Sequence, residues 1–170
     1  DTARAYAEFK KAGATTYGSL PGKELLDKVI VSSSDTPFAR FLKALGSTAS
    51  DWVRDGHTHF SGSAGGKCPY CQQKLPANFE NEIATTFDAQ YQQDIRDLGQ
   101  FQTTYSRETA DIVRVLQTNT ADAMPSLDLK AYQERLSLLE SKFEVNRQRI
   151  AEKVKEPSKT VSLEDTVHQK

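Results

Sequence analysis

The chain has 170 residues, a formal net charge of −1 at pH 7 and 26% charged residues, and its mean hydropathy is −0.61. It is long enough for one domain with a core, yet more polar than a compact enzyme of this size usually is, which favours an elongated helical body. Its charges form no block of one sign, so the sequence indicates neither a nucleic-acid contact nor a membrane-surface patch.

Targeting signals are not evident in the sequence. No apolar run approaches the roughly 20 residues that span a bilayer, and the first residues lack the layout of a signal peptide. We therefore expect a cytoplasmic protein without a membrane partner. Because the chain starts at Asp1 and not at Met, we also expect it to be a piece of a longer or processed protein.

The first part of the chain predicts short helices. One helix is expected over 2–12, ending at Gly13, and a second over about 25–30, where apolar residues follow helical spacing. A Gly-, Ser- and Pro-rich stretch separates the two.

Two more short helices are expected before the cysteines. Ser34 or Asp35 can cap the first of these, which carries an apolar stripe and ends at Gly46. The other is expected from about Ser50 to Gly56. The stretch HTHFSGSAGGK that follows is then a loop of small residues leading to the cysteines.

The second half of the chain predicts two long helices. Apolar residues recur every three or four positions from Phe79 onward, which predicts one helix of about 40 residues over 79–118. Met124-Pro125 breaks the pattern, and a second helix is expected over about 127–155. Because the break is short, the two helices are expected to pack antiparallel as a hairpin.

The second long helix carries a coiled-coil pattern. Its a and d positions are Leu129, Tyr132, Leu136, Leu139, Phe143, Asn146 and Ile150. Asn146 is a polar residue in this seam, which fits either the specification of register or a frayed helix end. The fold class is therefore all-α: residues 1–76 form short helices ending in a CPYC loop, 77–156 a long antiparallel hairpin, and 157–170 a tail.

Both cysteines of the chain lie in KCPYCQQKLP, as Cys68 and Cys71. Two thiolates two residues apart can bind one zinc ion, but they fill only half of its tetrahedral shell. A pair of free or redox-active thiols is the simpler interpretation, whereas a thioredoxin-like motif would need a βαβ context that the sequence lacks.

Two zinc arrangements stay open. In one, His57 and His59 complete a Cys2His2 site within the chain, although histidines two residues apart in an extended loop point to opposite sides. In the other, two copies of the chain each give Cys68 and Cys71 to one shared ion, so that the chain is a homodimer. Spacing alone does not separate these arrangements, and both histidines can also be ordinary loop residues.

Four separated blocks carry a resemblance to a known family: WVRDG, KCPYCQQKLP, FENEIATTFDAQYQQDI and KVKEPSKTVSLED, in this order. Together they resemble the coiled-coil insert of AAA-family ATPases of the RloC and PrrC type, the bacterial anticodon nucleases of phage defence and their relatives. The resemblance covers the chain from about Ser50 to its C-terminus.

The resemblance implies a zinc hook, which joins two subunits through one shared zinc. Carried over, the ligands are Cys68 and Cys71 of each copy, with half a zinc ion per chain. The domain would link subunits and transmit nucleotide-driven motion from the missing ATPase part, toward which residues 157–170 lead. The sequence departs from a simple hook because short helices and a glycine-rich loop flank the cysteines, where a simple hook has two long helices.

The chain itself has no signature of an enzyme. A phosphate-binding GxxxxGK[ST] loop is missing, and SAGGKC has neither the spacing nor the Ser or Thr. We therefore expect ATP binding and any RNA cleavage only in the parent protein. The contending interpretation is a metal-free helical module that recognises a partner protein or nucleic acid.

Overall fold

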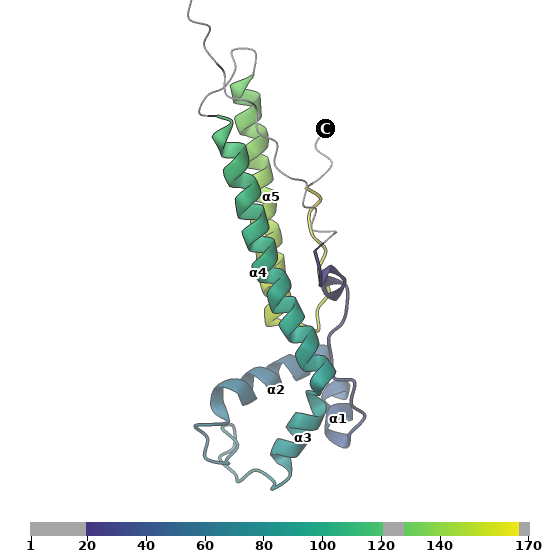
Figure 1. Ribbon diagram of the computed structural model, residues 1–170. Helices are drawn as coiled ribbons and strands as arrows, with labels where there is room; N and C mark the ends of the chain where they lie inside the picture. The colour runs from purple at the N-terminus through teal and green to yellow at the C-terminus, as the bar shows by residue number, and fades with distance from the viewer. Residues whose placement is uncertain (1–19, 121–127, 167–170) are drawn as a thin grey trace, which may run out of the picture.

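The computed structural model describes residues 20–120 and 128–166, in which helices joined by loops and turns make up the fold (Figure 1). The elements in chain order are η2 (Lys23–Leu26), α1 (Pro37–Leu45), α2 (Ser47–Phe60), α3 (Phe79–Thr86), α4 (Ala89–Thr118) and α5 (Leu129–Lys155). The described ranges contain no β-strand and only one isolated antiparallel bridge, between Lys67 and Lys74. The predicted all-α fold is confirmed. The expected helix over 2–12 and the break at Met124-Pro125 lie outside the described residues.

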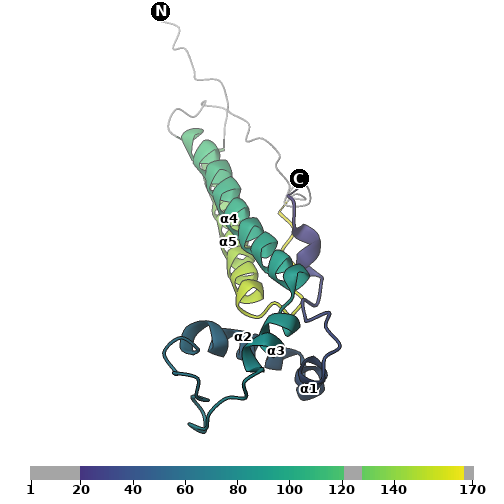
Figure 2. The same cartoon turned by 60° about the horizontal axis from the view of Figure 1, so that its bottom comes forward.

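Helices α4 and α5 form the long antiparallel hairpin that the sequence predicts (Figures 1 and 2). The side-chain contacts between them show the antiparallel arrangement, because later residues of α4 contact earlier residues of α5. Gln117 donates to Glu140 at 2.9 Å, and Arg147 donates to Thr109 at 3.1 Å. None of the described helices is both long and apolar enough to cross a bilayer.

The core lies where the lower part of the hairpin meets the short elements. Aromatic residues of α4 pack against the inner face of α5, and Tyr105 and Phe143 meet edge to face with ring centroids 6.4 Å apart. Packing of the two helices is expected to bury the seam residues Leu139 and Phe143; Phe143 is buried, whereas Leu139 is only partly buried against the same core. Each large apolar side chain that is fully buried contributes about 1.5–3 kcal/mol. The core comprises Leu25, Leu26, Ile30, Ile83, Phe87, Tyr91, Leu98, Phe101, Tyr105, Phe143 and Ile150.

The predicted single helix over 79–118 is wrong, because the chain breaks between α3 and α4. Asp88 has an extended backbone and caps α4, its carboxylate accepting from the Tyr91 N–H at 2.9 Å. The Ser33 hydroxyl also donates to this carboxylate. An aspartate that satisfies the free N–H groups of a new helix favours a new start over a continued turn.

The N-cap of helix α1 lies one or two residues later in the chain than predicted. Thr36 is its N-cap, where Ser34 or Asp35 was expected, and its hydroxyl accepts from the Ala39 N–H at 3.2 Å. Gly46 ends the helix as predicted, with a φ of 118° that favours glycine.

Helix α2 is longer than predicted. It starts directly after Gly46 and continues through Gly56 to Phe60, so the loop expected after Gly56 begins only at Ser61. An interior glycine costs a helix only about 1 kcal/mol, which the remaining contacts of α2 offset. The histidines therefore lie on the last turns of a helix.

The entering and leaving segments of the described chain run side by side along the hairpin (Figure 1). The Ile30 N–H donates to the Pro157 carbonyl at 3.1 Å, and the Val161 N–H donates to the Leu26 carbonyl at 3.0 Å. The tail shows no helix over 157–166. Both segments thus lie on the flank of the hairpin, while the cysteine loop lies at the end where α1, α2 and α3 gather (Figure 2).

Candidate functional site

The cysteine loop connects α2 to α3 and folds back on itself. Gly65 and Gly66 have φ angles of 59° and 73°, which let the chain turn without steric strain. The Leu75 N–H donates to the Gly66 carbonyl at 2.9 Å, and the Cys68 N–H donates to the Gln73 carbonyl at 2.8 Å. These bonds fasten the two arms of the loop around the CPYC segment.

The two thiols lie in a tight turn that the backbone organises. The Gln72 N–H donates to the Cys68 carbonyl at 2.7 Å, and Gln72 itself has a positive φ of 64°. Backbone N–H groups of Cys71 and then Tyr70 donate to the Cys68 sulfur, which lowers the pKa of that thiol. Neither cysteine is in a disulfide, and the Cys71 side chain also lies within hydrogen-bonding distance of Cys68.

This arrangement suits a thiolate that binds metal. The thiolate is the form that ligates zinc, and donors aimed at its sulfur both favour that form and orient it. The loop is exposed, so a second molecule can approach the two sulfurs. The chemistry of the donor set therefore fits zinc, with two ligands per chain.

The two histidines make polar contacts with groups other than the cysteines. His57 Nε2 lies 2.8 Å from a Glu80 carboxylate oxygen, and His59 Nδ1 lies 2.8 Å from the Asp55 carbonyl within α2. In residues 20–120 and 128–166, no three His, Cys, Asp or Glu side chains lie close enough together to hold a metal ion. The described part of the chain therefore does not assemble the Cys2His2 arrangement.

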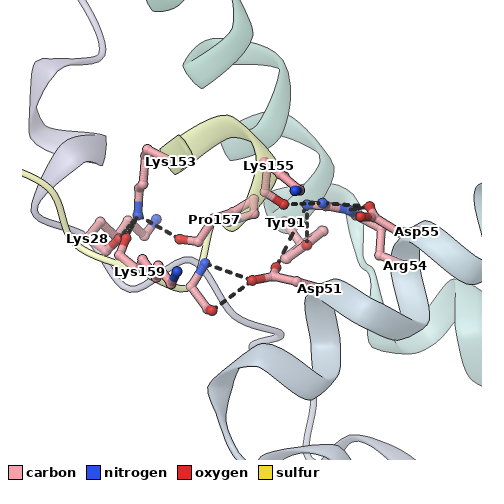
Figure 3. Close-up of polar contacts among 10 residues, drawn as sticks. Lys28, Asp51, Arg54, Asp55, Tyr91, Lys153, Lys155, Pro157 and Lys159 are labelled. Carbon is pink, nitrogen blue, oxygen red and sulfur yellow. Dashed lines mark hydrogen bonds and ion pairs between the residues drawn. The ribbon is translucent and has the colours of Figure 1, made fainter. Parts of the chain in front are cut away.

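A second polar centre lies at the junction between α2, α5 and the tail (Figure 3). The Lys153 ammonium has no exposed surface and donates to the Lys28 carbonyl at 2.5 Å and the Pro157 carbonyl at 2.6 Å. It also donates to the Lys159 carbonyl. Burial lowers the pKa of Lys153 to about 8. One side chain thus joins the entering segment, the end of α5 and the tail.

Helix α2 enters the same junction through two charged residues. The Asp51 carboxylate is buried and accepts from the Ser158 hydroxyl at 2.7 Å and from its N–H at 3.4 Å. Burial raises the pKa of this carboxyl, although the two Ser158 hydrogen bonds act in the opposite direction. Arg54 donates to the Tyr91 hydroxyl at 3.3 Å and to the Lys155 carbonyl at 3.1 Å. The segments WVRDG and KVKEPSK, about 100 residues apart, therefore meet here (Figure 3).

One family model spans this whole arrangement. The model AAA_13, described as an AAA domain, matches residues 2–170. The chain belongs to this AAA domain family. The relation to AAA-family ATPases, expected from about Ser50 to the C-terminus, is thereby confirmed, and the match extends it to residues 2–170. No curated protein and no solved structure matches it.

The sequence analysis did not identify the junction residues Asp51, Arg54 and Lys153. One signal was available: Lys153 occupies the next seam position after Ile150, where a coiled coil carries an apolar residue. A charged residue there indicates a buried polar contact. The partners of that contact, three backbone carbonyls in distant segments, leave no pattern in the sequence.

Proposed function

We propose that this chain is the zinc-hook and coiled-coil domain of an RloC/PrrC-like ATPase, joining two subunits through one zinc ion shared by Cys68 and Cys71 of each copy. The observation that carries the proposal is the tight turn that holds Cys68 and Cys71, closed by the hydrogen bond from the Gln72 N–H to the Cys68 carbonyl at 2.7 Å. Backbone N–H groups of Cys71 and Tyr70 also lower the pKa of Cys68. Such donors hold a thiolate in place for a metal.

Two copies of the turn complete the zinc shell. Each chain supplies two sulfur ligands, and a structural zinc site takes four at about 2.3 Å. Because His57 is hydrogen-bonded to Glu80 and His59 to the Asp55 carbonyl, the remaining two zinc ligands in this proposal come from a second copy. Association and metal binding are then one event, and removal of zinc separates the subunits.

The junction supports a mechanical role for the domain. Tail residue Ser158 is bonded to Asp51 of α2, and α2 ends at the cysteine loop. Lys153 fastens the same tail to the hairpin. A pull on the tail from the ATPase part of the parent therefore acts on α2 and, through it, on the hook.

The parent in this proposal is an ATPase of the anticodon-nuclease type that acts in phage defence. Its nucleotide site lies outside this chain, whose sequence has no GxxxxGK[ST] loop. In this arrangement the chain itself carries out no catalysis. Its function is to link subunits and to pass on the motion that ATP binding and hydrolysis produce.

The test is metal content measured together with mass in solution. The purified chain loaded with zinc should hold half an ion per chain and be a dimer by light scattering, and chelation should return it to a monomer. Replacing both Cys68 and Cys71 with Ser should abolish metal and dimer, whereas the matched change of His57 and His59 to Ala should leave both.

Two results would contradict the proposal. One zinc per monomer would mean a site within a single chain. A dimer that survives chelation and the double serine change would mean that helices, and not zinc, join the subunits.

A further inference from the structure

Helix α2 buries polar residues and exposes aromatic ones, although its Val53 packs against the core. Its buried positions are Ser50 and Asp51, with 3% and 4% exposure, whereas Trp52 and Phe60 are 68% and 57% exposed. Surface helices normally bury their apolar stripe and expose their charges. The junction with the tail accounts for the inward polar residues, because Asp51 bonds to Ser158. The outward aromatic residues remain more than half exposed within residues 20–120 and 128–166, although the Phe60 ring lies 6.3 Å from the His59 ring.

The outward residues form a continuous row along α2. Trp52, Gly56 and Phe60 are four residues apart, so they lie on one face of the helix. A Cβ atom added to Gly56 would meet nothing within 4 Å, which leaves the backbone open to close approach by another element. We refer to Trp52, Gly56 and Phe60 as the α2 row.

A groove adjoins the α2 row at its start. It has a volume of about 530 Å³ and lies between the end of α1, the first turns of α2 and the end of α5. Leu45, which is 62% exposed, lines it together with Trp52. Its charged lining residues are the acidic Asp51, Asp55 and Glu156 and the basic Lys155.

We propose that the α2 row is a contact surface for a second copy of this chain, packing beside the shared zinc ion. The inference rests on the proposed zinc hook. The row ends at Phe60, whose carbonyl accepts from the Ser63 and Ala64 N–H groups at the start of the cysteine loop. Two chains that share one ion through the same cysteines are related by a two-fold axis, which places the same surface of each near its partner.

The size of the hook explains why a second surface is needed. Stable protein interfaces bury roughly 800 Å² per partner, and two exposed thiols with their turn cover much less. Exposed aromatic side chains are the usual anchors of such interfaces. Pairing of the α2 rows adds apolar area and also fixes the angle between the two subunits, which an ion alone leaves free to rotate.

Intrinsic fluorescence tests the proposal, because Trp52 is the only tryptophan of the chain. The metal-free chain at low concentration should emit as an exposed indole. Zinc should shift the emission to shorter wavelength with the same concentration dependence as the dimer mass. An emission maximum already at short wavelength in the metal-free monomer would overturn the proposal, since another part of the chain would then cover Trp52.

Two variants separate this surface from the metal site. Trp52→Ala and Gly56→Lys should raise the dimer dissociation constant about tenfold or more in the presence of zinc, while the cysteines keep their metal. Leu138→Ala is the matched control, since Leu138 is 48% exposed but lies 17 residues before the end of α5 (155 − 138), roughly 25 Å along the helix. It should leave the dimer unchanged.

The outcomes distinguish this proposal from the zinc hook. A zinc dimer that is insensitive to both α2 variants and leaves the Trp52 emission unshifted overturns the α2 surface and leaves the hook intact. A dimer that persists after chelation yet dissociates in Trp52→Ala supports the α2 surface and overturns the hook. A chain that stays monomeric with and without zinc overturns both.

Discussion

The Asn146 side-chain amide donates a hydrogen bond to the Tyr105 hydroxyl at 2.9 Å, across the interface between α5 and α4. Asn146 is fully buried and also bonds the tail: its amide donates to the Glu164 carbonyl at 3.1 Å, and its oxygen accepts from the Glu164 N–H at 2.6 Å. It is therefore not at a frayed helix end. This polar residue of the seam forms hydrogen bonds with a third segment, the tail, and so connects the tail to the hairpin.

Removing this amide should destabilise the hairpin and release the tail. Asn146→Ala removes the hydrogen bonds of this buried side chain to Tyr105 and Glu164, so we expect a loss of about 2–3 kcal/mol in the free energy of unfolding. Tyr105→Phe should cost about 1 kcal/mol, and the double variant less than the sum. Urea unfolding of the four proteins measures the coupling. Strictly additive losses in the free energy of unfolding would show that the Asn146–Tyr105 hydrogen bond contributes nothing in solution.

Lys153 should be the most sensitive lysine of the chain. Lys153→Met leaves three backbone carbonyls without their buried donor, and we expect the free energy of unfolding to fall by about 3 kcal/mol. The matched control is Lys130→Met on the same helix, whose side chain is 88% exposed and which should change stability by less than about 0.5 kcal/mol. Thermal unfolding followed by circular dichroism compares them. An equal loss of stability in the two variants would contradict the role of the Lys153 hydrogen bonds in holding the junction together.

The sequence predicted the elements with strong local signals. The heptads of α5, the stop at Gly46 and the antiparallel hairpin all follow from spacing and from residues that favour or end a helix. The cap of α1 was displaced because Ser34, Asp35 and Thr36 are all good caps, and only the packing of the following turn selects one.

Other features depend on contacts that no local pattern reveals. The apolar spacing runs unbroken through Phe87, so the break before α4 shows only in Asp88, whose carboxylate is held by Ser33 from a distant segment. Helix α2 passes through Gly56 because Asp51 and Arg54 anchor it to the tail and to α5. For the cysteines, spacing indicated the chemistry, whereas the donors to the Cys68 sulfur emerge only from the folded turn.

Two glycines should respond to alanine in opposite directions. Gly22 has a φ of 90°, and a Cβ there would lie 3.4 Å from both the Asp97 carbonyl oxygen and Phe101, so Gly22→Ala should lower the free energy of unfolding by about 1–2 kcal/mol. Gly99 lies within α4 and a Cβ there meets nothing within 4 Å, so Gly99→Ala should raise stability by about 0.5–1 kcal/mol. Chemical denaturation measures both. A destabilising Gly99→Ala would mean that another molecule covers this face of α4.

The reactivity of Cys68 should depend on the folded turn. Backbone N–H groups of Cys71 and Tyr70 lower the pKa of Cys68, and the thiolate is the form that reacts with iodoacetamide. In a metal-free Cys71→Ser chain, which keeps both N–H donors, the alkylation rate should reach half its maximum at a lower pH in the folded protein than in urea.

The sign of the linked pH effect follows from the same donors. Because folding lowers the pKa of an acid, the Cys68 contribution to stability is present above the unfolded thiol pKa and is lost as the pH falls through the folded one. Zinc affinity should weaken over the same range, since protons compete with the metal for the sulfur. Zinc should also protect Cys68 from alkylation in the unmodified chain. The same alkylation midpoint in the folded protein and in urea would show that the N–H groups do not contact the Cys68 sulfur in solution. Folding would then not favour the thiolate form that binds a metal.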